Sequence, residues 1–179
     1  TLNVNNIKEV IKSSRNRILP VHIDSLTLTG SGNINGTGNA SANTISGNSG
    51  DNTLRGGAGE DSLTGNAGND KLYGERGADT LNGGEGSDTL KGGLGLDKLY
   101  GNSGDDIIYG GADADTISGG TAADTLYGDN GDDTINGGTG ADKLYGGKGD
   151  DSLNGDFAVD IIYGNSGDDT LRGGKGADT

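Results

Sequence analysis

The chain repeats itself every nine residues from Gly47 to its last residue, Thr179. Written in lines of nine, this stretch aligns without a gap: residues 47–55 are the first line, residues 56–64 the second, and a shortened last line begins at Gly173. A fixed short period indicates a repeat architecture, in which a unit buries its apolar side only by stacking on its neighbours. The repeat therefore constrains the fold class before composition is considered.

Each unit follows the pattern Gly-Gly-x-Gly-x-Asp-x-Leu/Ile-x, and we refer to its nine positions as columns. The first column is always Gly, and the eighth is Leu or Ile from Leu54 to Leu171. Gly permits tight turning, and a triplet centred on the eighth column would form a very short strand with one inward side chain. The sixth column is Asn52 and then always Asp: Asp61, Asp70, Asp79, Asp88, Asp97, Asp106, Asp115, Asp124, Asp133, Asp142, Asp151, Asp160, Asp169 and Asp178.

This nonapeptide resembles the RTX, or haemolysin-type calcium-binding, repeat family, over roughly three quarters of the chain. The resemblance implies an all-β fold, the right-handed parallel β-roll (a β-solenoid), in which two units make one coil. Eighth-column residues of alternate units would then face each other across a thin core. At two units per coil the fifteen lines give about seven coils, and with strands about 4.8 Å apart these coils form a stack about 35 Å long.

The chain before the regular repeat is harder to interpret. We expect a capping segment and irregular first strands over residues 1–37, and the β-roll over residues 38–179. Residues 38–46 carry Asn43 in the acid column and would form an irregular first coil. Near the start, Ile7, Val10 and Ile11 permit a short helix, whereas Leu2 and Val4 permit a strand. After Pro20, residues 21–23 and 26–28 alternate like half-buried strands, and Ile34 is expected to point inward.

Composition explains why such a chain would need a metal. Only 28% of the residues are hydrophobic, 39 are Gly and none is Cys, so neither an ordinary core nor a disulfide is available. The net charge is −14, which predicts disorder until a cation neutralises the chain and disfavours nucleic acid as a partner. No apolar run is long enough to span a membrane, and no nucleophile, phosphate-loop or zinc-protease motif occurs, so we predict that the chain is not an enzyme.

The sixth-column acids are the candidate metal ligands. Units two apart share an edge of the roll, so their Asp residues should form two rows. Neighbouring carboxylates about 5 Å apart repel by about 1 kcal/mol in water and several-fold more inside a protein, whereas Ca²⁺, held by six to eight hard oxygen ligands, would reverse the sign. Mg²⁺ is a weaker candidate because it retains its water, and the plainer alternative is that the Asp residues are solvated turn residues.

The resemblance implies that each Ca²⁺ lies between two stacked turns, held by both sixth-column carboxylates and by carbonyls of the first four columns. We expect one row from Asp61 through Asp79 to Asp178 and the other from Asp70 through Asp88 to Asp169. Six gaps on each edge would hold up to about twelve ions. The expected carbonyl ligands are those of Gly56, Gly59, Gly65, Gly68, Gly74, Gly77, Gly83, Gly86, Gly92, Gly95, Gly101, Gly104, Gly128, Gly131, Gly137, Gly140, Gly146, Gly149, Gly164 and Gly167.

Some of these sites should be weaker than others. Asp113, Ala122 and Ala158 replace the fourth-column Gly, where positive φ would be strained. Asn52 and Asp61 head the two rows and should hold incomplete sites, with Asn52 the weaker ligand.

The seventh and ninth columns should point outward. On one face the ninth column reads Tyr73, Lys91, Tyr109, Tyr127, Tyr145, Tyr163, with Ile107 and Ile161 beside it. Stacked tyrosines would either stiffen an exposed sheet or, at Tyr109, Tyr127, Tyr145 and Tyr163, form a docking strip for a second copy, a glycan or a surface.

For function, the resemblance implies a calcium-binding module, secreted or at the cell surface, that folds on binding Ca²⁺ outside the cell as part of a larger protein exported by type I secretion. The alternative is a structural or adhesive segment of a surface layer or adhesin that uses its rigid solenoid and tyrosine face. The accessory domain of a secreted enzyme is less favoured.

Overall fold

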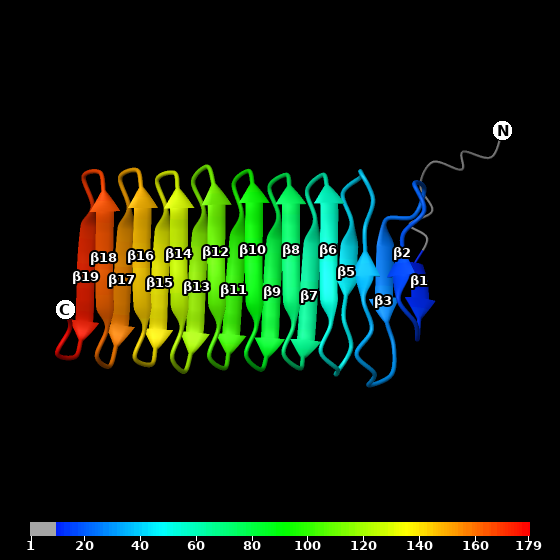
Figure 1. Cartoon of the computed structure of the whole chain (residues 1–179), viewed down its shortest axis with the longest axis horizontal. Helices are drawn as coiled ribbons and strands as arrows, with labels where there is room; N and C mark the ends of the chain where they lie inside the picture. Colours follow the sequence, from blue (N-terminus) through cyan, green and yellow to red (C-terminus); the bar gives the residue numbers. More distant parts are fainter. Residues whose placement is uncertain (1–9) are drawn as a thin grey trace.

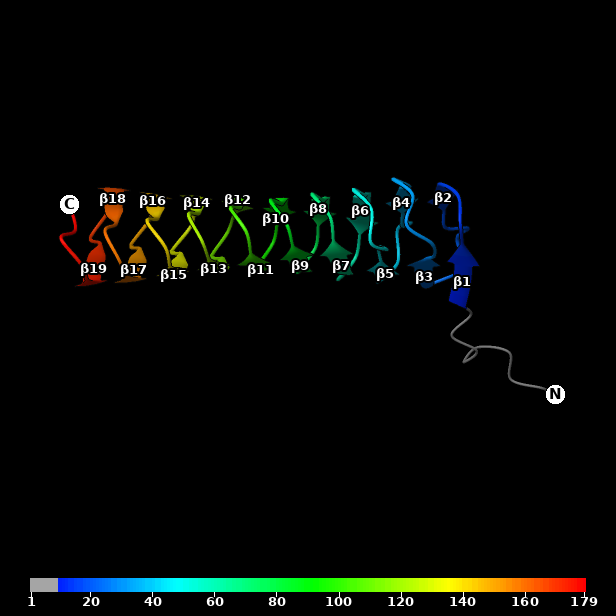
Figure 2. The same cartoon turned by 90° about the horizontal axis from the view of Figure 1, so that it is seen from below.

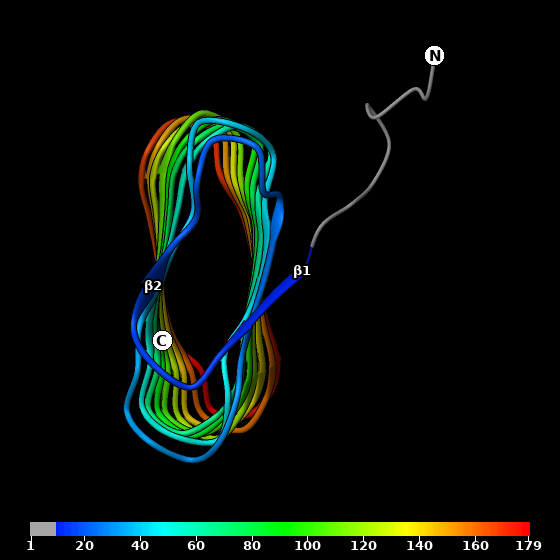
Figure 3. The ribbon, with the colours of Figure 1, turned by 90° about the vertical axis from the view of Figure 1, so that its right-hand side faces the viewer.

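Successive strands of the chain alternate between two parallel sheets, so each coil contributes one strand to each sheet. The computed structural model describes residues 10–179, which form an all-β parallel solenoid without a helix, consistent with a β-roll (Figure 1). Seen along its length, the solenoid is a flattened oval of stacked coils (Figure 3). The described residues contain no helix long and apolar enough to cross a membrane.

The strands before the regular repeat are short. They are β1 (Val10–Ser13), β2 (Arg17–Ile18), β3 (Ser25–Leu28), β4 (Gly36–Thr37) and β5 (Thr44–Ser46). The strands of the repeat each contain six residues. They are β6 (Thr53–Ala58), β7 (Ser62–Ala67), β8 (Lys71–Arg76), β9 (Thr80–Glu85), β10 (Thr89–Leu94), β11 (Lys98–Ser103), β12 (Ile107–Ala112), β13 (Thr116–Thr121), β14 (Thr125–Asn130), β15 (Thr134–Thr139), β16 (Lys143–Lys148), β17 (Ser152–Phe157), β18 (Ile161–Ser166) and β19 (Thr170–Lys175).

The odd-numbered strands form a ten-stranded sheet and the even-numbered strands a nine-stranded sheet, seen as two layers in Figure 2. Every pair is parallel, and in the repeat each residue pairs with the residue 18 positions later, as Leu90 does with Ile108. This register confirms two nine-residue units per coil and keeps each column of the repeat in line along the solenoid.

The strands are longer than the triplet that the sequence predicts. In β6, for example, the strand continues past Arg55 through the first three columns of the next unit, to Ala58. Inward positions alternate with outward ones over the sixth, eighth and first columns, as a strand requires. The first-column Gly is buried against the sixth-column Asp of its own unit, as Gly56 is against Asp61, and leaves room for that side chain where the strand reaches the turn.

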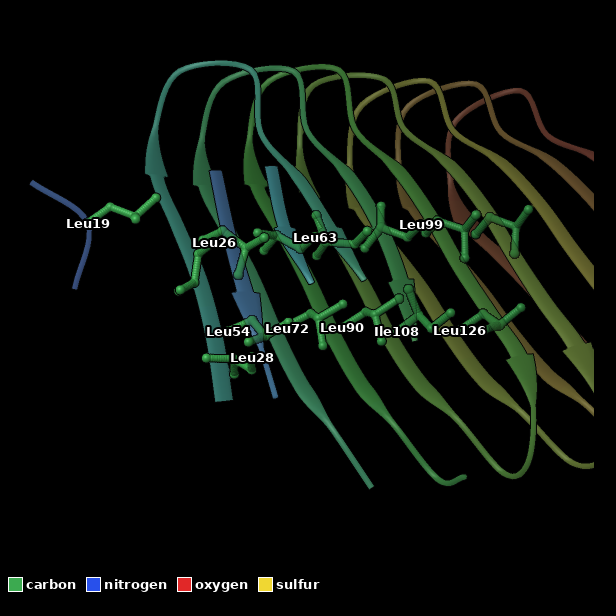
Figure 4. Close-up of a cluster of buried hydrophobic side chains, with 14 of the residues drawn as sticks. Leu19, Leu26, Leu28, Leu54, Leu63, Leu72, Leu90, Leu99, Ile108 and Leu126 are labelled. Atoms are coloured by element: carbon green, nitrogen blue, oxygen red, sulfur yellow. The ribbon is translucent and has the colours of Figure 1, made fainter. Parts of the chain in front are cut away.

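The core is a double row of eighth-column residues. Leu63 and Leu99 lie in one row and Leu72, Leu90 and Ile108 in the other, facing across the interior (Figure 4). Along the middle of the solenoid these side chains are at most 1% exposed, whereas Leu171 in the last strand is 50% exposed. The core is thus one side chain thick on each side, and every coil depends on its neighbours for burial.

The segment before the repeat belongs to the same solenoid. Strand β1 pairs with β3, and β2 pairs with β4, so both sheets continue across residue 37 without a break. The helix predicted as one alternative for Val10 and Ile11 is wrong, because both residues lie in β1, where Ile11 packs against the core. The other residues of that prediction, Leu2, Val4 and Ile7, lie outside the described residues.

The strand predicted at residues 21–23 is also wrong. These residues form a turn in which the Ile23 N–H donates to the Pro20 carbonyl at 3.0 Å, and Val21 is exposed. Pro20 has no N–H to offer a strand, which favours turning at this point. The second predicted strand is confirmed as β3, with Leu26 and Leu28 buried, and Ile34 packs against the core as expected.

Candidate metal centre

The sixth-column side chains point into the solenoid at its two edges. Their carboxylates are at most 2% exposed over a continuous run of units, which contradicts the alternative of solvated turn residues. The buried members are Asp61, Asp70, Asp79, Asp88, Asp97, Asp106, Asp115, Asp124, Asp133, Asp142, Asp151 and Asp160. Asp169 and Asp178, in the last coil, are partly exposed.

One oxygen of each carboxylate is fixed by the neighbouring coil. The backbone N–H of Asp88 donates to Asp106 Oδ1 at 2.7 Å, and the N–H of Asp106 donates to Asp124 Oδ1 at 2.8 Å. The same bond recurs along both edges and defines the two rows. The row that starts at Asp61 ends at Asp169, and the row that starts at Asp70 ends at Asp178. The prediction that the Asp61 row ends at Asp178 and the Asp70 row at Asp169 is therefore wrong. Members of one row must differ by whole coils of 18 residues, so the two end residues belong to the opposite rows.

The other oxygen of these carboxylates has no partner. Oδ2 is buried and accepts no hydrogen bond in any of the twelve buried aspartates. A buried carboxylate oxygen without a donor or a cation is strongly unfavourable. Two rows of such oxygens therefore run along the edges of the solenoid.

The first-column glycines leave the space beside these oxygens open. A Cβ added at Gly101 would meet both Asp106 Oδ2 and the carbonyl oxygen of Gly119, which belongs to the next coil. The same pair of oxygens surrounds Gly65, Gly92, Gly128 and Gly146. Carboxylate and carbonyl oxygens are the ligands that Ca²⁺ prefers, so the donor set fits this ion.

The predicted carbonyl ligands therefore divide into two groups. Carbonyls of the first column lie beside Oδ2, whereas those of the fourth column face the fourth-column Gly of the next coil, as the Gly86 carbonyl faces Gly104. Among residues 10–179 no three acidic, His or Cys side chains converge on one point. Backbone carbonyls would thus have to complete each site.

Burial also changes the protonation of the rows. Desolvation raises the pKa of Asp88, Asp97, Asp115 and Asp124 to about 7 and that of Asp106 to about 6. The backbone N–H bonded to Oδ1 lowers each pKa in part, and for all but Asp106 a neighbouring carboxylate of the same row raises it again. Without a cation, these carboxyl groups would therefore retain part of their protons near neutral pH.

The irregular units are placed as expected. Asp113, Ala122 and Ala158 have φ of 76°, 84° and 87°, so residues with a Cβ occupy the left-handed region there. At the head of the Asp70 row, Asn52 is buried but offers an amide in place of a carboxylate. The sequence interpretation missed Asn39 and Asn48, which bond to the sixth-column asparagines Asn43 and Asn52; the signal was an Asn four residues before each of these.

The tyrosines form a ladder on the outer face of the nine-stranded sheet. The rings of Tyr109 and Tyr127, Tyr127 and Tyr145, and Tyr145 and Tyr163 are stacked with centroids 4.9, 4.8 and 5.3 Å apart. At one end Lys91 Nζ lies 4.7 Å from the centroid of the Tyr109 ring and separates Tyr73 from the stack. The ring faces inside the ladder contact each other, so the ladder presents ring edges and hydroxyl groups outward.

Stacked turns with buried carboxylates and neighbouring backbone carbonyls define a β-solenoid whose two edges fit a hard metal ion. A family model described as the RTX calcium-binding nonapeptide repeat matches residues 37–72, 56–90, 64–99, 82–117, 91–126, 118–153, 127–162 and 145–179. The chain therefore belongs to the RTX calcium-binding repeat family, whose β-roll is a structural calcium-binding domain and not a catalytic fold. Members of this family are typically found in secreted proteins. A comparison with curated proteins gives no match.

Proposed function

We propose that this chain is a calcium-triggered folding module of an exported protein. The observation that supports the proposal is the set of twelve buried Oδ2 atoms without a hydrogen-bond partner. In the absence of a cation, folding must bury these oxygens and place their like charges next to one another along each row. Binding of Ca²⁺ between the coils would remove that cost, so the free energy of binding becomes free energy of folding.

The ions would be held in two rows, with up to six in each. The ligands are the carboxylates of successive row members and the first-column carbonyl between them, such as Asp106, Asp124 and the Gly119 carbonyl. Sites beside Asp113, Ala122 and Ala158 would be weaker because positive φ is strained there.

Calcium dependence suits a chain that must leave the cell before folding. At the low Ca²⁺ concentration of a cytosol the repeat would stay disordered, as its acidity and small core predict. Extracellular modules bind Ca²⁺ with dissociation constants of about 10⁻⁴–10⁻³ M, which suits folding after export. Together with the RTX family membership, this supports secretion by the type I route as part of a larger protein, to the medium or the cell surface.

A calcium titration followed by far-ultraviolet circular dichroism tests the proposal. We expect a disordered spectrum in excess chelator and a cooperative change to β structure as Ca²⁺ is added, with Mg²⁺ at the same concentration much less effective. Isothermal titration calorimetry would give the number of ions. A chain that is equally folded in chelator and in Ca²⁺ would rule out the proposed trigger.

A second candidate function is a structural or adhesive segment of a surface layer or adhesin. The tyrosine ladder favours it, because its hydroxyl edges lie on an open sheet face and Tyr163 is 51% exposed. Self-association, or contact with a surface or glycan, would then use this face. Sedimentation of the calcium-loaded chain against a Tyr109/Tyr127/Tyr145→Ser variant separates the candidates. If both proteins stay monomeric and neither binds a surface, the ladder only stiffens the sheet. The accessory domain of a secreted enzyme has the least support.

A further inference from the structure

We infer that the coils around residues 25–58 form a cap that folds without metal, because asparagine amides there make the contacts that Ca²⁺ would make further along. We call this segment the asparagine cap. It contains β3 to β6 and two pairs of asparagines, one at each edge of the solenoid: Asn39 with Asn43, and Asn48 with Asn52. The inference builds on the proposed calcium dependence of the remaining coils.

The pair Asn48 and Asn52 satisfies its own polar atoms. Asn52 Oδ1 accepts the backbone N–H of Asn48 at 2.8 Å. Asn52 Nδ2 donates to the Ile34 carbonyl at 2.7 Å and to Asn48 Oδ1 at 2.9 Å. Asn48 Nδ2 in turn donates to the Gly32 carbonyl at 3.0 Å. Both side chains are buried, and no oxygen or nitrogen of either is left without a partner.

The pair Asn39 and Asn43 repeats this arrangement at the opposite edge. Asn43 Oδ1 accepts the N–H of Asn39 at 2.7 Å, and Asn43 Nδ2 lies 3.3 Å from Asn39 Oδ1. Asn39 Nδ2 donates to the carbonyls of Pro20 and Ile23, each at 2.8 Å. The cap is thus closed by the same device on both edges.

Comparison with an aspartate coil shows why the amide can replace the ion. Asn52 Oδ1 lies beside Gly47 and the Gly65 carbonyl, as Asp106 Oδ2 lies beside Gly101 and the Gly119 carbonyl. In the aspartate coil that oxygen has no partner, whereas in the cap it accepts a hydrogen bond. The other atom also changes role: Asp106 Oδ1 accepts an N–H from the preceding coil, whereas Asn52 Nδ2 donates to a carbonyl of the preceding coil.

The second-column asparagines of the cap also point inward, whereas those of the later repeat point outward. Asn48 is 7% exposed and turns inward, whereas Asn66, in the same column and with φ of 84°, is exposed. The cap also prepares the first aspartate coils, because the N–H groups of Asn43 and Asn52 donate to Asp61 Oδ1 and Asp70 Oδ1 at 2.7 Å. A folded cap therefore offers a ready surface on which the first calcium-dependent coils stack.

Hydrogen exchange of the whole chain, followed by mass spectrometry at neutral pH, tests the inference. In excess chelator we expect amides of β3 to β6 to exchange at least about tenfold more slowly than in an unfolded chain, while those of β8 to β18 exchange at the unfolded rate. In Ca²⁺ both regions should be protected. If neither region is protected in chelator but both are in Ca²⁺, the inferred metal-free folding of the cap is wrong and the proposed calcium-triggered folding of the chain stands. If both regions are protected in chelator, the proposed calcium-triggered folding is wrong.

A pair of substitutions sharpens the test. Asn52→Asp replaces the Nδ2 donor by an oxygen that faces the Ile34 carbonyl, so protection of β3 to β6 in chelator should fall to the unfolded level and return with Ca²⁺. Asn82→Asp adds the same charge on the outer face, where its Oδ1 still accepts from Asn102 Nδ2, and should leave cap protection unchanged. Retained protection in Asn52→Asp would overturn the role of the amide, and if that variant does not fold in Ca²⁺, the wild-type exchange pattern alone decides.

Discussion

Adjacent aspartates show how strongly surroundings decide the role of one side chain. Asp105 is exposed and its Oδ1 accepts the N–H of Ala123 at 3.0 Å, whereas Asp106 is buried with an unpartnered Oδ2. The two residues are chemically identical and neighbours in the chain, yet only Asp106 belongs to a row.

We predict opposite effects of Asp106→Asn with and without metal. In Ca²⁺ the variant should lose about 3 kcal/mol of stability, because a charged ligand is removed from a buried site. In chelator it should be more folded than the wild type, because a buried unpaired charge is gone. Denaturant unfolding in Ca²⁺ and the β content by far-ultraviolet circular dichroism in chelator measure the two effects, with Asp105→Asn as the matched control. Equal effects of the two substitutions would contradict the assignment of the row.

The fourth column contains local strain that can be relieved. Ala122 and Ala158 have positive φ, which L-residues with a Cβ adopt at a cost of about 1–2 kcal/mol. We predict that Ala122→Gly raises the stability of the calcium-loaded chain by about 1 kcal/mol. The control is Gly140→Ala, one coil further along the same edge, where an added Cβ would meet the Ala122 carbonyl and should destabilise. Thermal unfolding in Ca²⁺ measures both, and a destabilising Ala122→Gly would show that this φ is not strained.

At the scale of the strand, the tyrosine ladder ties neighbouring coils on the outer face. Tyr127 stacks on Tyr109 and on Tyr145, whereas Tyr100 lies on the opposite sheet between Asn82 and Ser118. Because a stacked aromatic pair contributes about 0.5–1.5 kcal/mol beyond its buried area, Tyr127→Ala should cost about 1–3 kcal/mol more than Tyr100→Ala. Equilibrium unfolding of the two variants in Ca²⁺ gives the difference, and near-equal losses would mean that the stack adds nothing.

The repeat strands show how far the sequence predicts the fold. The family resemblance implies two units per coil, and with that number the identity of each column predicts the inward Leu and Ile rows and the tyrosine face. Strand length was underestimated, since the extension past Arg55 comes from pairing of Gly57 and Ala58 with the next coil of the same sheet, which a column of glycines does not reveal. The strands β1 and β2 could not be predicted either, because their pairing with β3 and β4 sets their structure and their own sequence does not follow the repeat.

For the candidate metal centre, the sequence predicts which residues line the two edges but not how their atoms are bonded. The invariant sixth column identifies the carboxylates, but the sequence does not show which oxygen each N–H engages or that Oδ2 is left without a partner. The network of Asn39, Asn43, Asn48 and Asn52 was missed because the residues that it bonds, such as Ile34, lie in the irregular coils.

At the scale of the whole molecule, the rows make stability depend on pH in opposite directions with and without Ca²⁺. Burial raises the pKa of Asp97 and Asp124 from 3.8 to about 7 in the folded chain. A carboxyl group whose pKa is raised on folding contributes to stability below about pH 4, where it is protonated in both states, and this contribution is lost as the pH rises toward 7. In chelator, acidification from pH 8 to pH 5 should therefore increase β structure.

In Ca²⁺ the dependence should reverse, because protons and the cation compete for the same oxygens. The midpoint of a calcium titration should move to higher concentration as the pH falls from 8 to 5. Circular dichroism over this range checks both directions. A chelated chain that unfolds on acidification through the same range would contradict the protonation of the rows.

Hard cations are proposed to lie between the coils, beside the unpartnered oxygens. Diffraction from crystals grown in Ca²⁺, with anomalous data that identify calcium, would locate them. We expect two lines of anomalous peaks, one along each edge, with successive peaks about 4.8 Å apart and each peak in contact with Oδ2 of a row aspartate and a first-column carbonyl. Ordered Asp88, Asp106 and Asp124 side chains with no calcium between their coils would contradict it.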